Sequence, residues 1–231
     1  MYHSIIISGK NTFAEWGLIP TSRPVVNPPE VKTTYVDLPA AHGVLDYTTL
    51  LLSGVPYGQR EGSWEFVLRP GVRWATVYST IMNALHGKTH TVILEDDPAF
   101  LYQGRLTVNK WKSDQSHSII TIDYNLDPFK QSVISSEEKD WLWDDAFARD
   151  IRYGTFSVRG EKYRNLINDG IDPSLPTFTC TAPVTVEFHS VTYSLVAGTN
   201  VNANLTLQPG DNIMVFRGEG DVTVRYREVS L

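Results

Sequence analysis

The sequence predicts a mainly β protein made of two β-sandwich domains, the first of which carries one α-helix. Three observations predict this fold class. Most of the 231 residues fall into short β-rich runs that end at Gly, Pro or Asn. A single segment has helical periodicity, and a stretch without clear periodicity, residues 129–151, separates two groups of strand-like runs. We therefore predict domains at residues 1–135 and 136–231, because a chain of this length is long enough to form two cores.

The first domain begins with a short strand and a proline-rich arm. Residues 2–8 are β-rich and predict the strand. Five prolines follow between Trp16 and Pro39. Proline fixes φ, cannot donate a backbone hydrogen bond and biases the preceding residue toward extended conformations. We therefore expect residues 11–37 to form an extended arm rather than a helix or a central strand.

Strand signals resume at the end of the arm. The β-rich runs 32–39 and 43–51 stand on either side of a turn that is bounded by Gly43. In residues 62–70, large apolar side chains alternate with others, which is the pattern of a half-buried strand.

The helix is predicted over residues 74–86. Its apolar residues recur at spacings of three and four, and Gly87 is a plausible stop; they are Trp74, Val77, Tyr78, Ile81 and Leu85. Residues 89–113 then read as two strands joined by an acidic turn, and residues 117–128 as a third strand. One helix inserted into a series of strands predicts a sandwich with a helix packed on it.

The second domain is predicted to be all β. After the boundary stretch, residues 154–231 contain short β-like runs broken by Gly, Pro and Asn, without helical periodicity. This pattern is typical of a β-sandwich.

Composition excludes several classes of protein. The 20 basic and 26 acidic residues give a formal charge of -6, and the basic residues form no cluster, which argues against specific nucleic-acid binding. The single cysteine, Cys180, cannot form an intramolecular disulfide. The N-terminus lacks the features of a signal peptide, and no apolar run approaches the length of a membrane span. We expect a soluble protein that is made in a cytoplasm and has no membrane partner.

The sequence gives little support for an enzyme or a metal protein. Glu95, Asp96 and Asp97 lie between two strand-like runs, next to a proline, and are expected to form a solvated hairpin tip rather than a catalytic pair or a calcium loop. His86 and His90 have helical spacing for a shared metal, but Gly87 interrupts the helix between them. Cys180 lies in a strand-like run, where a buried thiol is commoner than a nucleophile. We expect no catalytic residue, cofactor or metal.

Glycan recognition is a further alternative. Several aromatic residues could stack on sugars if they share one exposed face, although such residues more often fill cores; they are Trp111, Trp141, Trp143, Tyr153 and Tyr193. We take Trp141 and Trp143, which are two residues apart, as the candidate glycan contacts.

The chain resembles the distal tail protein (Dit) family of long-tailed bacteriophages and prophages of Gram-positive bacteria. The resemblance lies mainly in the first 130 residues and more loosely in the C-terminal part. It is carried, in this order, by "NTFAEWGLIPTSRPVVNPPEVKTTYVDLPAAHGVLDYT", "YGQREGSWEFVL", "WATVYSTIMNALHGK", "VILEDDPAFLYQGRLTVNKW" and "IDYNLDPFK".

The resemblance implies a structural protein of the virion tail tip or baseplate, made in the host bacterial cytoplasm. It implies a first domain like a tail-tube protein and a second domain that is galectin-like or like a carbohydrate-binding module. It also implies a six-fold ring of this protein that extends the tail tube. The partners implied are the tail tube protein and a tail-associated lysin or fibre (receptor-binding) hub protein.

The proline-rich arm suits such a ring, in which every protomer needs a projecting feature and a matching receptor surface. We expect the arm to lie on a neighbouring subunit, because a restricted segment loses little entropy on docking. Its candidate interface residues are Trp16, Leu18, Ile19, Val25, Val26 and Tyr35. Two alternatives remain: the arm packs on its own domain, or the protein is a carbohydrate-binding module that contacts the host cell wall through the C-terminal sandwich.

Overall fold

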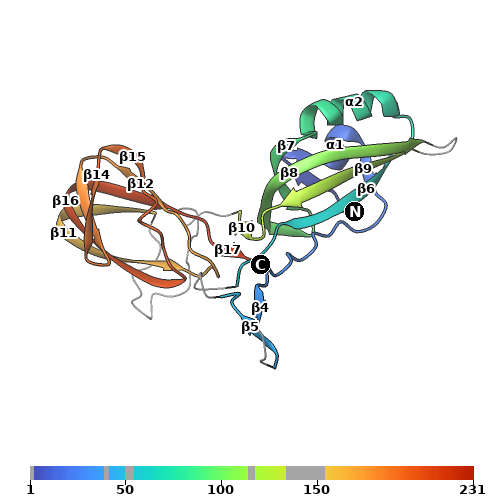
Figure 1. The fold of residues 1–231 in the computed structure, drawn as a ribbon. Helices are drawn as coiled ribbons and strands as arrows, with labels where there is room; N and C mark the ends of the chain where they lie inside the picture. Colours follow the sequence, from blue (N-terminus) through green and yellow to red (C-terminus); the bar gives the residue numbers. More distant parts are fainter. Residues whose placement is uncertain (1–2, 39–41, 50–54, 114–117, 134–153) are drawn as a thin grey trace. The chain divides into compact units, whose positions relative to one another are not determined.

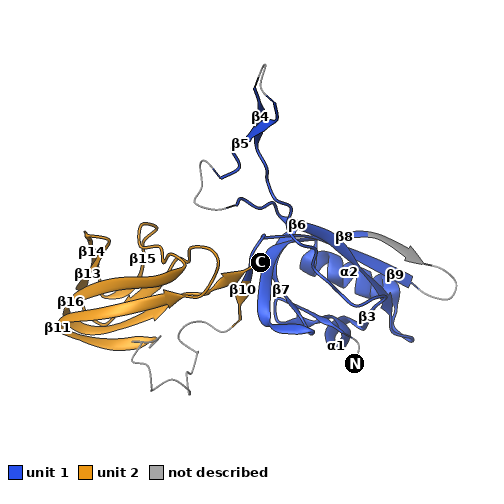
Figure 2. Cartoon of the chain, turned by 90° about the horizontal axis from the view of Figure 1, so that it is seen from below, with its two compact units in different colours: residues 1–130, 231 blue, residues 131–230 orange. Residues whose placement is uncertain are grey.

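The computed structural model describes residues 3–38, 42–49, 55–113, 118–133 and 154–231, with side chains omitted at 110–113. The chain is mainly β and divides into two compact units, residues 1–130 with 231 and residues 131–230 (Figure 2). Each unit has its own hydrophobic core. The predicted fold class of two β domains is therefore confirmed. The predicted boundary at residues 135 and 136 lies outside the described residues.

A twisted antiparallel sheet forms the first unit. Its strand order is β2-β1-β7-β8-β9-β6-β3, with bounds β1 Ile5–Ile7, β2 Lys10–Asn11, β3 Leu18–Pro20, β6 Arg60–Leu68, β7 Lys88–Leu94, β8 Asp97–Ser113 and β9 Ser118–Leu126. The alternation predicted for residues 62–70 is confirmed by β6, in which Trp64 and Phe66 are buried. Two further short strands are β10 (Lys130–Ser132) and β17 (Val229–Ser230).

Helix α2 (Trp74–Leu85) confirms the helix predicted at 74–86 (Figure 1). Ile81 and Leu85 are buried in the core of the first unit, and four further apolar side chains of the helix pack against it; they are Val77, Tyr78, Met82 and Ala84. The period of three to four residues thus marks the face that meets the sheet.

The structure contains a second helix, α1 (Thr12–Trp16), which the sequence analysis did not predict. The Asn11 side chain accepts hydrogen bonds from the backbone N–H groups of Phe13 at 2.9 Å and Ala14 at 3.0 Å. Gly17 ends the helix with a left-handed φ of 66°. These are standard N- and C-cap arrangements. The helix ends before the first proline of the arm, so proline does not oppose it.

A small separate sheet follows in the chain. Strands β4 (Tyr35–Asp37) and β5 (Val44–Asp46) form an antiparallel hairpin that pairs with no other strand among the described residues. Figures 1 and 2 both draw it apart from the large sheet.

The second unit contains a six-stranded antiparallel sheet with a curled, sandwich-like core. Its strands are β11 Thr155–Asn168, β12 Thr177–Cys180, β13 Val184–Phe188, β14 Val191–Leu195, β15 Gly198–Val201 and β16 Gly210–Arg225. The main strand order is β14-β13-β16-β12-β15, and β11 also pairs with β16. Phe178 and Phe216 are fully buried in the core. The described part of this unit has no helix, as predicted.

Candidate functional site

Residues 24–30, which we call the strap, lie across the core-facing side of their own sheet. Trp64 Nε1 donates a hydrogen bond to the carbonyl oxygen of Val25 at 2.8 Å, and the backbone N–H of Asn27 donates to the Tyr124 hydroxyl at 3.0 Å. The backbone N–H of Gly58 closes the strap by donating to the carbonyl of Glu30 at 2.7 Å. This part of the predicted arm therefore packs on its own domain.

Gly62 makes the contact between strap and sheet possible. A Cβ atom at this position would lie 2.3 Å from the Tyr124 hydroxyl oxygen and 2.8 Å from Asn27 Nδ2. The Tyr124 ring cannot move away easily, because it stacks on Trp64 with centroids 4.3 Å apart. The strand therefore needs a residue without a side chain at this position.

Arg60 fastens the strap from the same strand. Its side chain is buried, and it donates to the carbonyl oxygens of Asn27 at 3.0 Å and Pro128 at 2.7 Å. Its guanidinium also lies over the Tyr102 ring. Burial lowers the pKa of Arg60 and raises that of Tyr102. Carbonyl oxygens and the aromatic ring replace the water that this cation loses.

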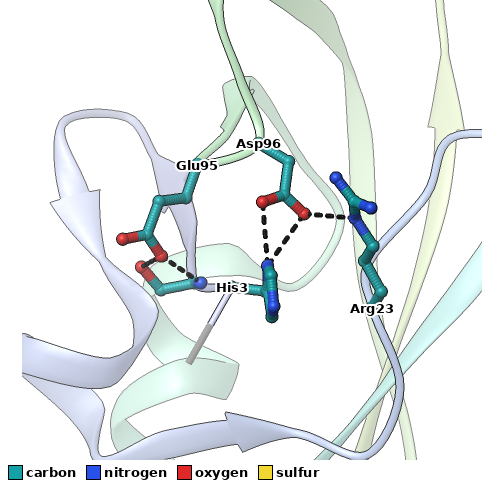
Figure 3. A network of polar contacts seen from close by, with 5 residues as sticks. His3, Arg23, Glu95 and Asp96 are labelled. Carbon is teal, nitrogen blue, oxygen red and sulfur yellow. Dashed lines mark hydrogen bonds and ion pairs between the residues drawn. The ribbon is translucent and has the colours of Figure 1, made fainter. Parts of the chain in front are cut away.

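The acidic turn holds the segment that leads into the strap (Figure 3). Asp96 accepts hydrogen bonds from Arg23 Nε at 2.7 Å and pairs with His3 Nδ1 at 2.8 Å. The hydrogen bonds from His3, and then from Arg23, lower the pKa of the Asp96 carboxyl. Glu95 accepts from the backbone N–H of Ser4 at 2.6 Å and from its hydroxyl at 2.9 Å.

The predicted hairpin turn is thus correct, but its carboxylates are not merely solvated. Asp97 also pairs with Lys130, at 3.3 Å. Each acid is committed to a structural contact with another segment, so the cluster offers no carboxyl pair that is set up for acid–base work.

Two of the six predicted interface residues must be corrected. Trp16, on α1, is 7% exposed and Leu18, on β3, is fully buried, both in the core of their own unit. Ile19 is half-buried on β3, and Val26 is half-buried on the strap. Val25 and Tyr35 are exposed. Helix α1 and strand β3 place the start of the arm in the core, where Trp16 and Leu18 are buried and therefore poor candidates for an interface.

The projecting feature is instead the β4–β5 hairpin. It carries six exposed apolar side chains: Tyr35, Val36, Leu38, Val44, Leu45 and Tyr47. Val36 lies opposite Leu45 and so shares its face, while Tyr35 and Val44 lie opposite acidic residues on the other face. Its base is held by backbone hydrogen bonds from Lys32 to Pro56 at 2.9 Å and from Tyr47 to Thr34 at 2.8 Å. Apolar side chains on both faces of an isolated hairpin indicate a surface made for contact.

The remaining candidates that the structure describes form no chemical centre. Trp141, Trp143 and Tyr153 lie outside the described residues, as does the side chain of Trp111, and Tyr193 packs half-buried against the core of the second unit. Cys180 is buried, and burial raises the pKa of its thiol.

The two histidines whose spacing would suit a shared metal in a helix, His86 and His90, lie on different elements. His86 is exposed at the end of α2, whereas His90 lies on β7 with its Nδ1 2.9 Å from the Ser8 hydroxyl. Across the described residues no group of three or more side chains is placed to hold a metal ion. None of the described helices has the length and apolar character needed to cross a membrane.

Sequence comparisons identify no relative of this chain. No protein-family model matches it, and no curated protein matches it. Nine chains of solved structures match its fold. One is the crystal structure of the Dit protein (gp 19.1) of phage SPP1, described as a paradigm of the hub adsorption apparatus in phages that infect Gram-positive bacteria. The match covers 100% of both chains with a TM-score of 0.63 and 11% sequence identity. The chain therefore has the fold of a phage distal tail protein over its whole length.

Proposed function

We propose that this protein is a structural component of a phage tail tip that assembles into a ring and serves as a hub. Two observations support the proposal: the whole-chain likeness in fold to a protein described as part of a hub adsorption apparatus, and the exposed apolar hairpin. The hairpin is the observation that carries the ring, because a head-to-tail contact needs a projecting surface on every protomer.

The energy available from the hairpin favours a cooperative assembly. Its six apolar side chains are each about half exposed, and completing the burial of such a side chain contributes roughly 1 kcal/mol. One contact is then worth at most about 6 kcal/mol, which corresponds to a dissociation constant of tens of micromolar. Two protomers associate weakly at this strength, whereas a closed ring gains one contact for every protomer. Ring formation therefore depends on concentration or on a template.

The strap pre-organises this contact. Arg60, Tyr124 and Trp64 fix the chain immediately before the hairpin, so the base of the hairpin does not have to be ordered when it docks. A segment that is already fixed loses less conformational entropy on association. The sequence analysis expected one arm to make the subunit contact. In this proposal the strap packs on its own sheet, and the hairpin makes the contact.

The symmetry, the partners and the type of second domain are proposed from the resemblance to distal tail proteins. The ring is six-fold, extends the tail tube and holds a tail-associated lysin or fibre protein, and the protein is made in the host bacterial cytoplasm. The second domain is galectin-like or like a carbohydrate-binding module. The protein acts without catalysis and without a cofactor.

The test is the mass of the purified protein by light scattering over a wide concentration range, combined with negative-stain images. A ring of six has a mass of six times 26.0 kDa, about 156 kDa. The double variant Val36→Glu/Leu45→Glu is expected to remain monomeric. Val201→Glu, at a 60% exposed apolar residue of the second unit, is the matched control and should assemble like the unchanged protein.

Two results would contradict the proposal. One is a ring that forms equally well with both glutamates in the hairpin. The other is a protein that stays monomeric at every concentration, both alone and when mixed with tail tubes as a template.

A further inference from the structure

The outer face of the second unit carries an exposed aromatic residue among ordered polar groups. Tyr163 on β11 is 59% exposed, and Ile213 on β16 is 65% exposed. Tyr163 lies opposite Val215, and Glu161 lies opposite Arg217. Side chains two residues apart on a strand share one face. These residues therefore form one solvent-facing surface across β11 and β16, to which β13 adds Glu187.

The polar groups of this surface hold one another in fixed positions. Arg217 Nε donates to Glu161 Oε2 at 2.8 Å, and Arg217 Nη1 donates to Glu187 Oε2 at 2.6 Å. The hydrogen bonds from Arg217, and then from Tyr163, lower the pKa of Glu161, and the same bond to Glu161 raises the pKa of the Tyr163 hydroxyl. The hydroxyl of Tyr163 is thereby tied to Glu161, one of the two carboxylates that Arg217 bridges.

Stability of the fold does not account for this arrangement. Exposed ion pairs add little to stability, and the second unit already has a complete core built around Phe178 and Phe216. An oriented ring beside oriented acceptors and donors is instead suited to a ligand with an apolar ring face and several hydroxyl groups. An ionised carboxylate has about four acceptor positions, so Glu161 and Glu187 can each accept further hydroxyl donors.

We propose that this surface, centred on Tyr163 with Glu161, Arg217 and Glu187, binds an uncharged saccharide. The C–H face of a pyranose ring stacks on Tyr163, and its hydroxyl groups donate to the two carboxylates. Thr185, opposite Arg217, and Thr192, opposite Glu187, add hydroxyl groups to the same face.

The net charge of this surface favours uncharged saccharides over anionic ones. One guanidinium between two carboxylates leaves a local net charge of about -1, which repels sugars that carry carboxylate or phosphate groups. A protein partner fits less well, because close packing over this surface would remove three charged groups from water at a high cost. A saccharide leaves them partly solvated and replaces water hydrogen bonds with its own.

This inference is independent of the proposed ring. It gives the glycan-binding alternative a site other than Trp141 and Trp143. A ring can form without any sugar, and sugar can bind to a monomer.

The test is saturation-transfer NMR of the full chain with methyl glucoside, methyl galactoside, N-acetylglucosamine and N-acetylgalactosamine, with glucuronic acid as the anionic comparison. At least one uncharged sugar should bind in the millimolar range, and glucuronic acid should not. Tyr163→Ala should weaken binding about ten-fold or more. Tyr163→Phe keeps the ring and should retain most of the binding, while Glu187→Gln should weaken it less than Tyr163→Ala does. Val201→Ala, at a 60% exposed apolar residue on another strand of the second unit, is the matched control and should bind like the unchanged protein.

Three results would overturn the inference, once circular dichroism has shown that the variants are folded. The first is that none of the four uncharged sugars binds. The second is that binding survives Tyr163→Ala unchanged. The third is that Tyr163→Ala alters the assembled mass but not sugar binding, which would make this face a protein contact.

Discussion

Replacing Gly62 by alanine should destabilise the first unit by about 2–6 kcal/mol. The new Cβ would lie 2.3 Å from the Tyr124 hydroxyl oxygen and 2.6 Å from Tyr124 Cζ, both well inside van der Waals contact. If Tyr124 moves, the backbone N–H of Asn27 loses its acceptor, which costs about 1–3 kcal/mol when the group stays buried. Overpacking between the strand and the strap adds about 1–3 kcal/mol.

The measurement is urea unfolding followed by tryptophan fluorescence. Four of the six tryptophans lie before residue 131, so the signal reports mainly on the first unit. Gly58→Ala is the matched control, because a Cβ there would have its nearest neighbour, the Glu30 carbonyl oxygen, at an ordinary 3.5 Å. We expect this control to change stability by less than about 1 kcal/mol in either direction.

A double-mutant cycle sharpens the test of Gly62. In a Tyr124→Phe background the hydroxyl clash is absent, so Gly62→Ala should cost less than it does in the unchanged protein. The reasoning about the strap would be refuted if Gly62→Ala behaved like Gly58→Ala, or if its cost were the same in both backgrounds.

Three further predictions concern the contacts around the strap and the second core. Asn11→Ala removes the N-cap of α1 and should cost about 1 kcal/mol in urea unfolding; equal stability would argue against the cap. The lowered pKa of Asp96 contributes stability above the pKa of this group in the unfolded chain, and the contribution is lost as the pH falls through its lower folded pKa. The stability difference between the unchanged protein and Asp96→Asn should therefore shrink in acid, and a constant difference across that range would contradict the assignment. Asn212→Ala leaves the backbone N–H of Gln208 without its 2.8 Å acceptor and should lower the free energy of unfolding of the second unit by about 1–3 kcal/mol, read by circular dichroism. A change below about 0.5 kcal/mol would show that this N–H finds another partner.

Local patterns predicted some elements well. Helix α2 was predictable because the period of its apolar residues is a property of neighbouring positions in the chain. Helix α1 was predictable in principle from Asn11 and Gly17, which are good capping residues. The prolines that follow it led us to expect an extended arm over the whole of residues 11–37.

The strap depends on information that one sequence does not display. Its partners Trp64 and Tyr124 are 39 and 97 positions away from the strap residues that they bind. Alternation indicated that Trp64 is buried, but it could not show what covers it. Gly62 was the available signal, because a glycine inside a strand often marks a close backbone approach.

The candidate saccharide surface could not be predicted either, because it depends on which side chains of the folded sheet face the solvent. Tyr163 and Tyr193 both lie in β-rich runs, and residue type does not show which one faces water. The alternation from buried Phe156 and Val158 places odd-numbered residues of β11 outward, and Tyr163 follows that rule. The sequence analysis instead took Trp141 and Trp143 as the candidate contacts because they are two residues apart.

The strap and the hairpin are subject to different evolutionary constraints. The strap is constrained by the folding of its own sheet, and the hairpin by the contact that it is proposed to make. Among the described residues, the hairpin meets the rest of its unit through backbone contacts at its base, such as those of Lys32 and Tyr57. In the proposed ring, substitutions in β4 and β5 leave the folding of the large sheet almost untouched and are constrained only by the contact with the neighbouring copy. If the proposed ring forms, this surface can change by mutation together with the surface that receives it on the next copy, so that rings of different variants do not mix within one cell.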